Sequence, residues 1–304
     1  MSTVIHFGLP KTGTTTLQKD IFPSLQGWGL LTRPQTQGDF FMNFLQYADE
    51  SLWEKDRPPV PSMLAARGNL IVSDEALSGK LLGWGATNRT RNIRRLAQLF
   101  PGARALIFLR DQASLIRSMY STFLLMPYGE PREISEFLWP PKQGRNRREG
   151  INRLGSGQGE LYFNTNQFYL HLDSLLFSPL ISAVSEGFPG PEVILYEEMA
   201  DNPAAVSEKL SKLFGEKVSL EGIAPRNRSE DNIKKYNLRE SHSKTKWGRY
   251  SQRYLHSRRA EKPPPTLEAV TSEIGNYFHA DNLRLRKMLP SVDFSCRAGA
   301  YPYQ

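Results

Sequence analysis

The residues best suited to chemistry lie near the start of the chain, where an apolar segment runs into a turn rich in glycine and threonine. Residues 4–17 read Val-Ile-His-Phe-Gly-Leu-Pro-Lys-Thr-Gly-Thr-Thr-Thr-Leu. Gly8 and Gly13 allow a tight turn and a close approach of the backbone to a ligand. A helix that opens at Thr14 offers free N–H groups and a dipole that favour an anion, and Lys11 adds a positive charge. The pattern predicts a phosphate-binding loop.

The position of the lysine separates this loop from that of the nucleoside triphosphatases. In G-x-x-x-x-G-K-[ST] the lysine follows the second glycine, whereas here Thr14 has that place and Lys11 precedes Gly13. The segment resembles the 5′-phosphosulfate loop of the sulfotransferases, in which Pro-Lys-x-Gly-Thr-Thr wraps the phosphosulfate of 3′-phosphoadenosine 5′-phosphosulfate (PAPS). The resemblance implies that this donor is bound by Lys11, Thr12, Gly13, Thr14, Thr15 and Thr16. Taken alone, the segment also fits a glycine turn that holds no phosphate.

A second motif follows about a hundred residues later. Arg110 comes directly after an apolar strand, at the end where ligands gather in open α/β sheets, and Ser118 lies two helical turns further on. Arginine offers a bidentate fork for phosphate and serine a neutral donor. Sulfotransferases use an arginine and a serine at this spacing for the 3′-phosphate of PAPS, which implies that role here. The alternative pairs Arg110 with Asp111 in a structural contact.

One part of the family pattern is missing. The cytosolic animal enzymes also grip the 3′-phosphate with a late Arg-Lys-Gly loop, which this sequence lacks. We expect Arg228 to serve instead. The other candidates in the same basic segment are Arg226, Lys244, Lys246 and Arg249.

Sulfuryl transfer requires stabilisation of a leaving phosphate oxygen and a base for the acceptor hydroxyl. We expect Lys11 to bridge the leaving oxygen and the sulfuryl group, so that no metal is needed. Glu75 follows an apolar strand and resembles the catalytic glutamate of tyrosylprotein and several bacterial sulfotransferases. Asp74 is the competing base, and an acidic pair after a strand is also a common helix cap. His6 reads as a buried core histidine, and His171 would serve only if the fold brought it near.

Alternating strands and helices predict an α/β fold with a central parallel sheet flanked by helices. We expect one P-loop-like domain over residues 1–304, with a helical C-terminal portion. The expected strands are 3–7, 69–73, 104–109 and 192–196, and the expected helices are 91–100, 113–125, 167–176, 203–214 and a closing helix through Val270 and Phe278. Residues 129–159 read as a lid or acceptor-binding excursion, and residues 226–290 as a basic segment and closing helices.

Charge and composition narrow the class of protein. The net charge is +8 over 304 residues, and the excess lies in residues 226–262, with twelve Lys or Arg against four Asp or Glu. The single cysteine, Cys296, favours a reducing compartment, and we expect a cytoplasmic protein without a signal peptide or membrane span. We expect the acceptor to be a small molecule or a glycan, and we expect no nucleic-acid partner. The product formed from PAPS would be 3′,5′-ADP. The oligomeric state stays open.

Two other functions fit parts of the sequence. A P-loop nucleotide kinase or ATPase would share the sheet and the glycine turn, but it predicts a lysine after Gly13. A nucleic-acid-binding module is suggested by aromatic residues within the basic run, such as Trp247 and Tyr250. The acceptor hydroxyl is expected on a carbohydrate, a glycolipid or a small metabolite. Trp53 and Trp139 could stack on a sugar, although such side chains more often pack in a core.

Overall fold

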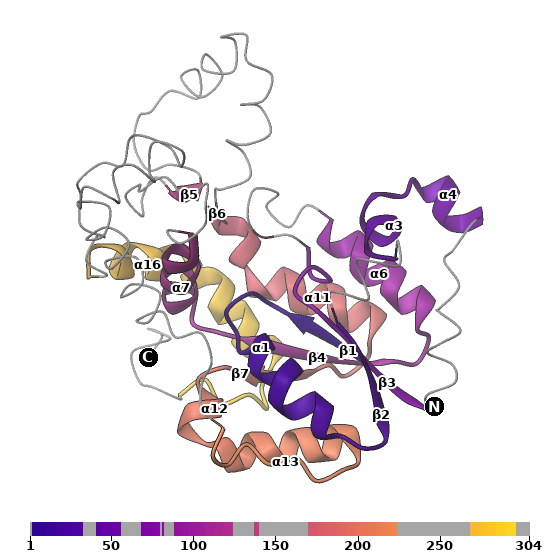
Figure 1. Cartoon of the computed structure of the whole chain (residues 1–304). Helices are drawn as coiled ribbons and strands as arrows, with labels where there is room; N and C mark the ends of the chain where they lie inside the picture. The colour runs from indigo at the N-terminus through magenta and orange to yellow at the C-terminus, as the bar shows by residue number, and fades with distance from the viewer. Residues whose placement is uncertain are drawn as a thin grey trace, which may run out of the picture.

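A five-stranded parallel sheet forms the centre of the molecule (Figure 1). The structure is a computed structural model, and it describes residues 2–32, 41–55, 68–79, 81, 88–123, 137–139, 170–223 and 268–295. The strands lie in the order β2-β3-β1-β4-β7, so the chain starts in the middle of the sheet, forms the edge strand β2, returns to place β3 between β2 and β1, and then adds β4 and β7 on the other side. Their bounds are β1 Thr3–Gly8, β2 Trp28–Leu31, β3 Asn69–Asp74, β4 Arg104–Leu109 and β7 Glu192–Leu195.

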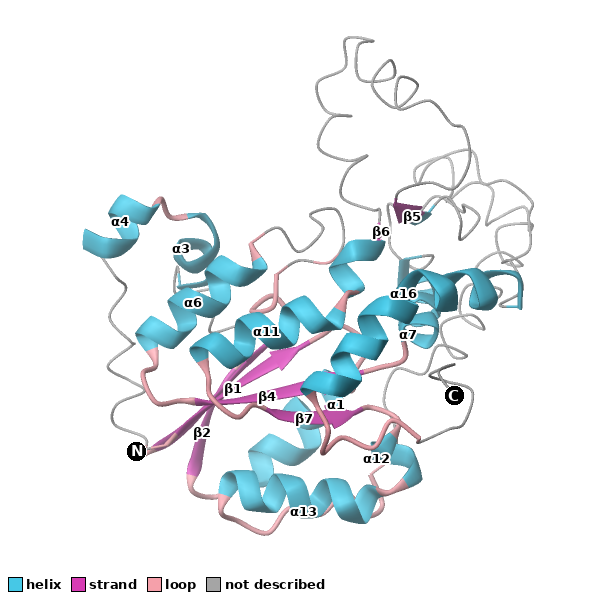
Figure 2. Ribbon diagram, turned by 180° about the vertical axis from the view of Figure 1, so that it is seen from behind, coloured by secondary structure: helices cyan, strands magenta, loops and turns pink. Residues whose placement is uncertain are grey.

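Helices cover both faces of the sheet, as Figure 2 shows. One face carries α3, α4, α6, α7, α11 and α16, and the other carries α1 with its continuation and α13. The helices are α1 Thr14–Thr16, α3 Phe41–Tyr47, α4 Glu50–Lys55, α6 Arg89–Leu99, α7 Gln112–Phe123, α11 Phe177–Gly187, α12 Glu198–Asp201, α13 Pro203–Phe214 and α16 Glu268–Met288. Shorter turns are η1 Leu17–Ile21, η2 Phe22–Ser24 and η4 Leu172–Leu175, and a separate two-stranded pair joins β5 Leu138–Trp139 to β6 Leu170–His171.

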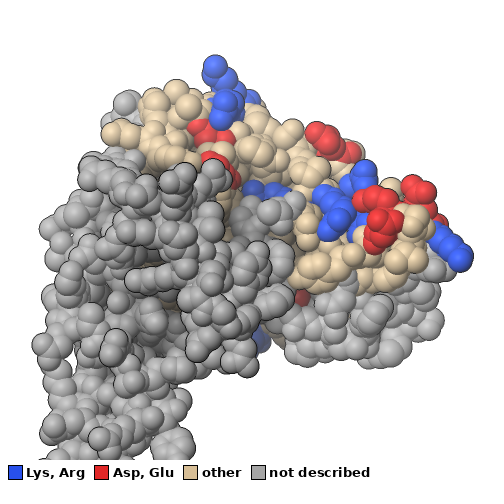
Figure 3. Space-filling view, turned by 90° about the horizontal axis from the view of Figure 1, so that it is seen from above, with Lys and Arg blue, Asp and Glu red and all other residues tan. Residues whose placement is uncertain are grey.

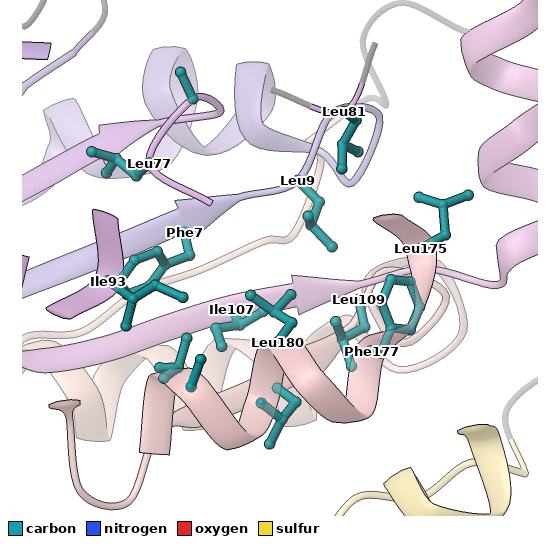
Figure 4. Packing of buried hydrophobic residues seen from close by; sticks show 14 of the residues in the cluster. Phe7, Leu9, Leu77, Leu81, Ile93, Ile107, Leu109, Leu175, Phe177 and Leu180 are labelled. Carbon is teal, nitrogen blue, oxygen red and sulfur yellow. The ribbon is translucent and has the colours of Figure 1, made fainter. Parts of the chain in front are cut away.

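The strands are apolar on both sides because both faces of the sheet are covered. Phe7 of β1 and Ile107 of β4 point into the core under α11, where Leu180 meets them (Figure 4). Val4 and Phe108 point the opposite way, into the core under α13. Burial of one such side chain contributes roughly 1.5–3 kcal/mol. The central strands are therefore held firmly enough to position the loops at their ends.

All four expected strands are present, and four of the five expected helices form within a few residues of the expected bounds. Asp111 caps α7 by accepting a hydrogen bond from the Ser114 N–H at 2.8 Å, and Asn202 caps α13 by accepting from the Ala205 N–H at 3.1 Å. The helix expected over 167–176 is wrong. Its described part is β6 followed by η4, and the helix of this region, α11, begins only at Phe177.

A long-range contact explains where α11 begins. Asp281, buried on α16, accepts hydrogen bonds from the backbone N–H groups of Phe177 at 2.7 Å and Ser178 at 3.2 Å. Its other carboxylate oxygen accepts from the Ser178 hydroxyl. The N-terminal cap of α11 is thus supplied about a hundred residues away, and local sequence reasoning could not find it.

The segments with the strongest compositional signals lie largely outside the described residues. Only 137–139 of the excursion 129–159 is described, and none of the basic stretch 226–262. The prediction of a single domain over 1–304 stays a prediction. At the end of the molecule formed by α4 and α6, Figure 3 shows acidic and basic side chains intermixed, and Arg94 and Glu50 form an ion pair there at 2.8 Å. The end formed by α4 and α6 therefore presents a mixed surface, with the acidic side chains from α4 and the basic ones largely from α6.

Candidate active site

The loop after β1 has a tightly defined backbone. A Cβ at Gly8 would lie 2.7 Å from the Thr14 hydroxyl oxygen, so a larger residue would push the loop apart. Gly13 has a φ of +86°, which suits glycine. The hydroxyl groups of Thr12 and Thr14 both donate to the Leu9 carbonyl, at 2.7 and 3.3 Å. The loop is therefore held closed by its own side chains.

The helix after the loop begins as the sequence predicts. The Gly13 carbonyl accepts the first hydrogen bonds, from the N–H groups of Thr16 at 2.9 Å and Leu17 at 3.1 Å. The N–H groups that precede these have no acceptor within the helix, because the first turn always leaves its donors unpaired there. Thr12, Thr14 and Thr16 are buried, whereas Thr15 is half-buried. The groups best placed for an anion are thus the backbone N–H donors and the Thr15 hydroxyl.

Lys11, Glu75 and Arg110 gather at one edge of the sheet. They follow β1, β3 and β4, which are neighbours in the sheet. Burial lowers the pKa of Lys11, the charge of Glu75 raises it, and the charge of Arg110 lowers it. Both charges therefore act on the lysine ammonium, and the three predicted residues form one cluster.

The two neighbouring carboxylates at the end of β3 have different surroundings. Asp74 is 1% exposed, and its Oδ1 accepts a hydrogen bond from the Ala76 N–H at 2.8 Å, which stabilises the turn that follows β3. Glu75 is half-buried and acts electrostatically on Lys11. The geometry favours Glu75 over Asp74 as the carboxylate that meets a substrate.

Arg110 is hydrogen-bonded to the loop, and its charge also acts on Asp111. Its Nη1 donates to the Lys11 carbonyl at 2.8 Å, and its guanidinium lies 4.5 Å from the centre of the Tyr196 ring. Its Nε is buried and has no hydrogen-bond partner among the described residues. One donor of Arg110 thus holds the loop, and a second one has no partner among the described residues.

The remaining members of the predicted phosphate site are placed differently. Ser118 is 3% exposed in the second turn of α7, and its carbonyl accepts hydrogen bonds from the hydroxyls of Ser121 and Thr122. Arg228 lies outside the described residues, as do Arg226, Lys244, Lys246 and Arg249. The cooperation of Ser118 with Arg110 in binding a phosphate stays a prediction.

Tyr196 and Glu197 are site residues that sequence reasoning did not identify. Tyr196 packs on Arg110, and Glu197 accepts a hydrogen bond from the Asp111 N–H at 3.2 Å. Burial raises the pKa of both Glu197 and Asp111. Their position directly after β7 could have indicated them, because it places them at the same edge of the sheet as Arg110.

Two of the other side chains considered for the site, Trp53 and His6, have structural roles. Trp53 is 1% exposed, and its Nε1 donates to Gln98 at 2.7 Å, so it packs in the core. His171 is the last residue of β6, and its Nδ1 lies 3.8 Å from Oδ2 of Asp173. His6 is fully buried, with Nδ1 2.7 Å from the Ser73 hydroxyl oxygen. The expectation of a buried core histidine at position 6 is confirmed.

The burial of His6 predicts a pH-dependent stability. Burial lowers the pKa of His6 to about 3, from an ordinary value of 6.5 in the unfolded chain. Between these values the unfolded chain binds a proton that the folded chain excludes, so stability is lost as the pH falls below about 6.5, by up to ~1.4 kcal/mol per pH unit. When the pH is lowered from 7 to 5, we expect the free energy of unfolding of the His6→Gln variant to fall by about 2 kcal/mol less than that of wild type, as measured by urea unfolding. His279→Gln, a change on the exposed side of α16, serves as the control, and an equal loss in wild type and His6→Gln would contradict the prediction.

Two further properties concern only the part of the chain that the structure describes. Its His, Cys, Asp and Glu side chains form no group of three or more that could hold a metal ion. None of its helices combines the length and the apolar character needed to cross a bilayer.

Comparison with known proteins supports the fold. The sequence matches no family model and no curated protein. The structure is similar to a crystal structure of a sulfotransferase from Alicyclobacillus acidocaldarius, with a TM-score of 0.52 and 16% identity over 97% of this chain and 98% of that chain. A mouse sulfotransferase, SULT7A1, complexed with PAP aligns with a TM-score of 0.31 and 14% identity over 95% of this chain and 85% of that chain, which is too low a score to add to the assignment. With its five parallel strands and the loop after β1, the chain has the sulfotransferase fold, a P-loop-like α/β fold.

Proposed function

We propose that the protein is a sulfotransferase that moves the sulfuryl group of PAPS to an acceptor hydroxyl. The observation that carries this proposal is the cluster of Lys11, Glu75 and Arg110 at the carboxyl ends of three neighbouring strands. A cation on an anion-binding loop, a carboxylate beside it and an arginine next to both are the groups that this transfer needs. The sulfotransferase fold supports the same reaction.

The donor would be held at its two ends. The backbone N–H groups from Gly13 to Thr15, with the hydroxyl of Thr15, would bind the 5′-phosphate at the helix start. Arg110 would bind the 3′-phosphate, and its buried Nε, unpartnered among the described residues, is a donor suited to an anionic oxygen. We assign Ser118 and Arg228 to the same phosphate as predictions from sequence.

The transfer itself is an in-line displacement at sulfur. The acceptor oxygen forms a bond to sulfur, the bond from sulfur to the phosphate oxygen breaks, and that oxygen gains negative charge. Lys11 would stabilise this charge, and Glu75 would take the proton of the acceptor hydroxyl. Because the charge of Glu75 raises the pKa of Lys11, the carboxylate opposes the lowering of that pKa by burial and thus favours the cationic form of the lysine.

The acceptor is proposed by class only. A hydroxyl on a carbohydrate, a glycolipid or a small metabolite fits the sequence, and screening acceptors with labelled PAPS would identify it. No metal enters the proposed reaction. The cytoplasmic location inferred from the single cysteine stays a prediction.

Binding of 3′,5′-ADP tests the proposal directly. At a hundred times its Kd the ligand stabilises the folded protein by about 2.7 kcal/mol, which raises the Tm by roughly 5 °C. ATP with Mg²⁺ at the same concentration should leave the Tm unchanged. A shift with ATP and Mg²⁺ alone would favour a kinase or ATPase, and stabilisation by a single-stranded oligonucleotide alone would favour a nucleic-acid-binding module.

A further inference from the structure

The two predicted ends of the donor site are joined by a direct hydrogen bond. Arg110, predicted to bind the 3′-phosphate, donates through Nη1 to the backbone carbonyl of Lys11 at 2.8 Å. Lys11 lies in the loop predicted for the 5′-phosphate.

Lys11 has an unusual backbone conformation. Its φ is +67°, and it is the only non-glycine residue with positive φ in the described part of the chain. A side chain with a Cβ disfavours this left-handed region because Cβ approaches the following carbonyl oxygen. Such a conformation persists only where its surroundings enforce it. The hydrogen bond from Arg110 fixes the carbonyl of this strained residue.

Tyr196 lies against Arg110 and against the loop at Gly13. Its backbone N–H donates to the Leu109 carbonyl at 2.7 Å, which places Tyr196 beside Arg110 where β4 and β7 end. The guanidinium of Arg110 lies 4.5 Å from the ring centre. The same ring faces the loop, since a Cβ at Gly13 would lie 3.3 Å from its Cε2 atom. The ring therefore contacts the arginine and also limits the space at the loop's second left-handed turn.

We propose that Arg110 and Tyr196 are positioning residues for the loop formed by residues 9–16. Arg110 holds Lys11 in the left-handed conformation, and the Tyr196 ring holds both the arginine and Gly13. Arg110 thus acts on both ends of the donor site: it orients the 5′-phosphate loop through Nη1 and offers Nε to the other phosphate. The identity of the bound nucleotide rests on the proposed function, but the support of the loop does not.

Hydrogen exchange in the ligand-free protein tests the support by itself. A hydrogen bond from a charged donor contributes about 1.5–3 kcal/mol, so Arg110→Ala should speed exchange of the Thr16 and Leu17 amides, which donate to the Gly13 carbonyl of the loop, at least about tenfold. Tyr196→Leu should do the same, whereas Tyr196→Phe keeps the ring and should keep the protection. Since the two residues act in one chain of contacts, the double variant should exchange little faster than Arg110→Ala.

A matched control lies at the other end of the same strand. Arg104 donates to the Leu213 carbonyl, far from the loop along β4. Arg104→Ala should leave exchange of the Thr16 and Leu17 amides unchanged, and the amides of β1 report in every variant whether the sheet has stayed folded. Wild-type exchange of the loop in a folded Arg110→Ala protein would overturn the proposal.

A second measurement separates positioning from phosphate binding. Adenosine 5′-monophosphate has no 3′-phosphate, so an arginine that only binds that phosphate has no effect on its affinity. We expect Arg110→Ala to weaken binding of both AMP and 3′,5′-ADP, by at least about tenfold for AMP, and Tyr196→Leu to weaken AMP binding as well. Loss of 3′,5′-ADP affinity with unchanged AMP affinity would refute the positioning role. If wild type bound neither nucleotide, the proposed function would fail, and the exchange data would still decide the role of Arg110 and Tyr196.

Discussion

Replacing Lys11 with alanine is expected to lower kcat/KM for sulfuryl transfer about 10³-fold, because the variant lacks the cation that stabilises the leaving oxygen. The fold should survive. Burial lowers the pKa of Lys11, which means that its charged form is disfavoured there, so removing it relieves an unfavourable burial. Alanine also retains Cβ, so the conformational preference at this left-handed position changes little. We therefore expect a Tm no lower than that of wild type.

The measurement compares initial rates with PAPS and a working acceptor. Lys19→Ala, a change at an exposed lysine in η1 of the same helical run, provides the control and should keep the wild-type rate. A Lys11→Ala protein that keeps its rate would rule out the assigned role. A variant that loses its rate and also unfolds would show instead that Lys11 stabilises the loop.

Glu75→Gln is expected to reduce kcat about 10²–10⁴-fold with a poorly acidic hydroxyl, which is the usual contribution of a general base. Glutamine has nearly the same size, so the turn after β3 should be kept, especially since Asp74 rather than Glu75 accepts the hydrogen bond from Ala76. The acidic limb of the pH profile of kcat/KM should disappear with the carboxylate.

The same substitution has a second effect that does not depend on turnover. The charge of Glu75 raises the pKa of Lys11, so its removal lowers that pKa. Lys11 then loses its proton at a lower pH, and binding of 3′,5′-ADP should weaken at a lower alkaline pH in the variant than in wild type. Glu54→Gln, at an exposed position of α4, is the control for both measurements. An unchanged rate would show that another residue is the base. If the binding of 3′,5′-ADP weakened at the same alkaline pH in the variant and in wild type, the charges of Glu75 and Lys11 would not be coupled.

Local sequence patterns predicted the elements that carry the chemistry. Strand β1, its loop and the helix start at Thr14 follow from a short run of apolar residues, two glycines and a cluster of threonines. The capping residues of α7 and α13, Asp111 and Asn202, follow from rules that act within three residues. The convergence of Lys11, Glu75 and Arg110 could also be anticipated, since each comes directly after a strand of a parallel sheet.

Other features could not be anticipated from local patterns. Strand β2 is only four residues long and contains a glycine, which is depleted in strands, so its sequence gives a weak strand signal. The start of α11 depends on Asp281, about a hundred residues later in the chain. The apolar spacing of residues 167–176 suggested a helix, but this cap places the helix start at Phe177.

What the sequence by itself determined is the set of chemical groups and the strands and caps that bring them to one edge of a sheet, because those features depend on residues close together in the chain. Only the tertiary structure decided how the groups act on one another. The hydrogen bond from Arg110 to the Lys11 carbonyl and the packing of Tyr196 on Arg110 and Gly13 join residues about a hundred or more positions apart. Such contacts form only after β1, β4 and β7 have paired, and no local propensity encodes them.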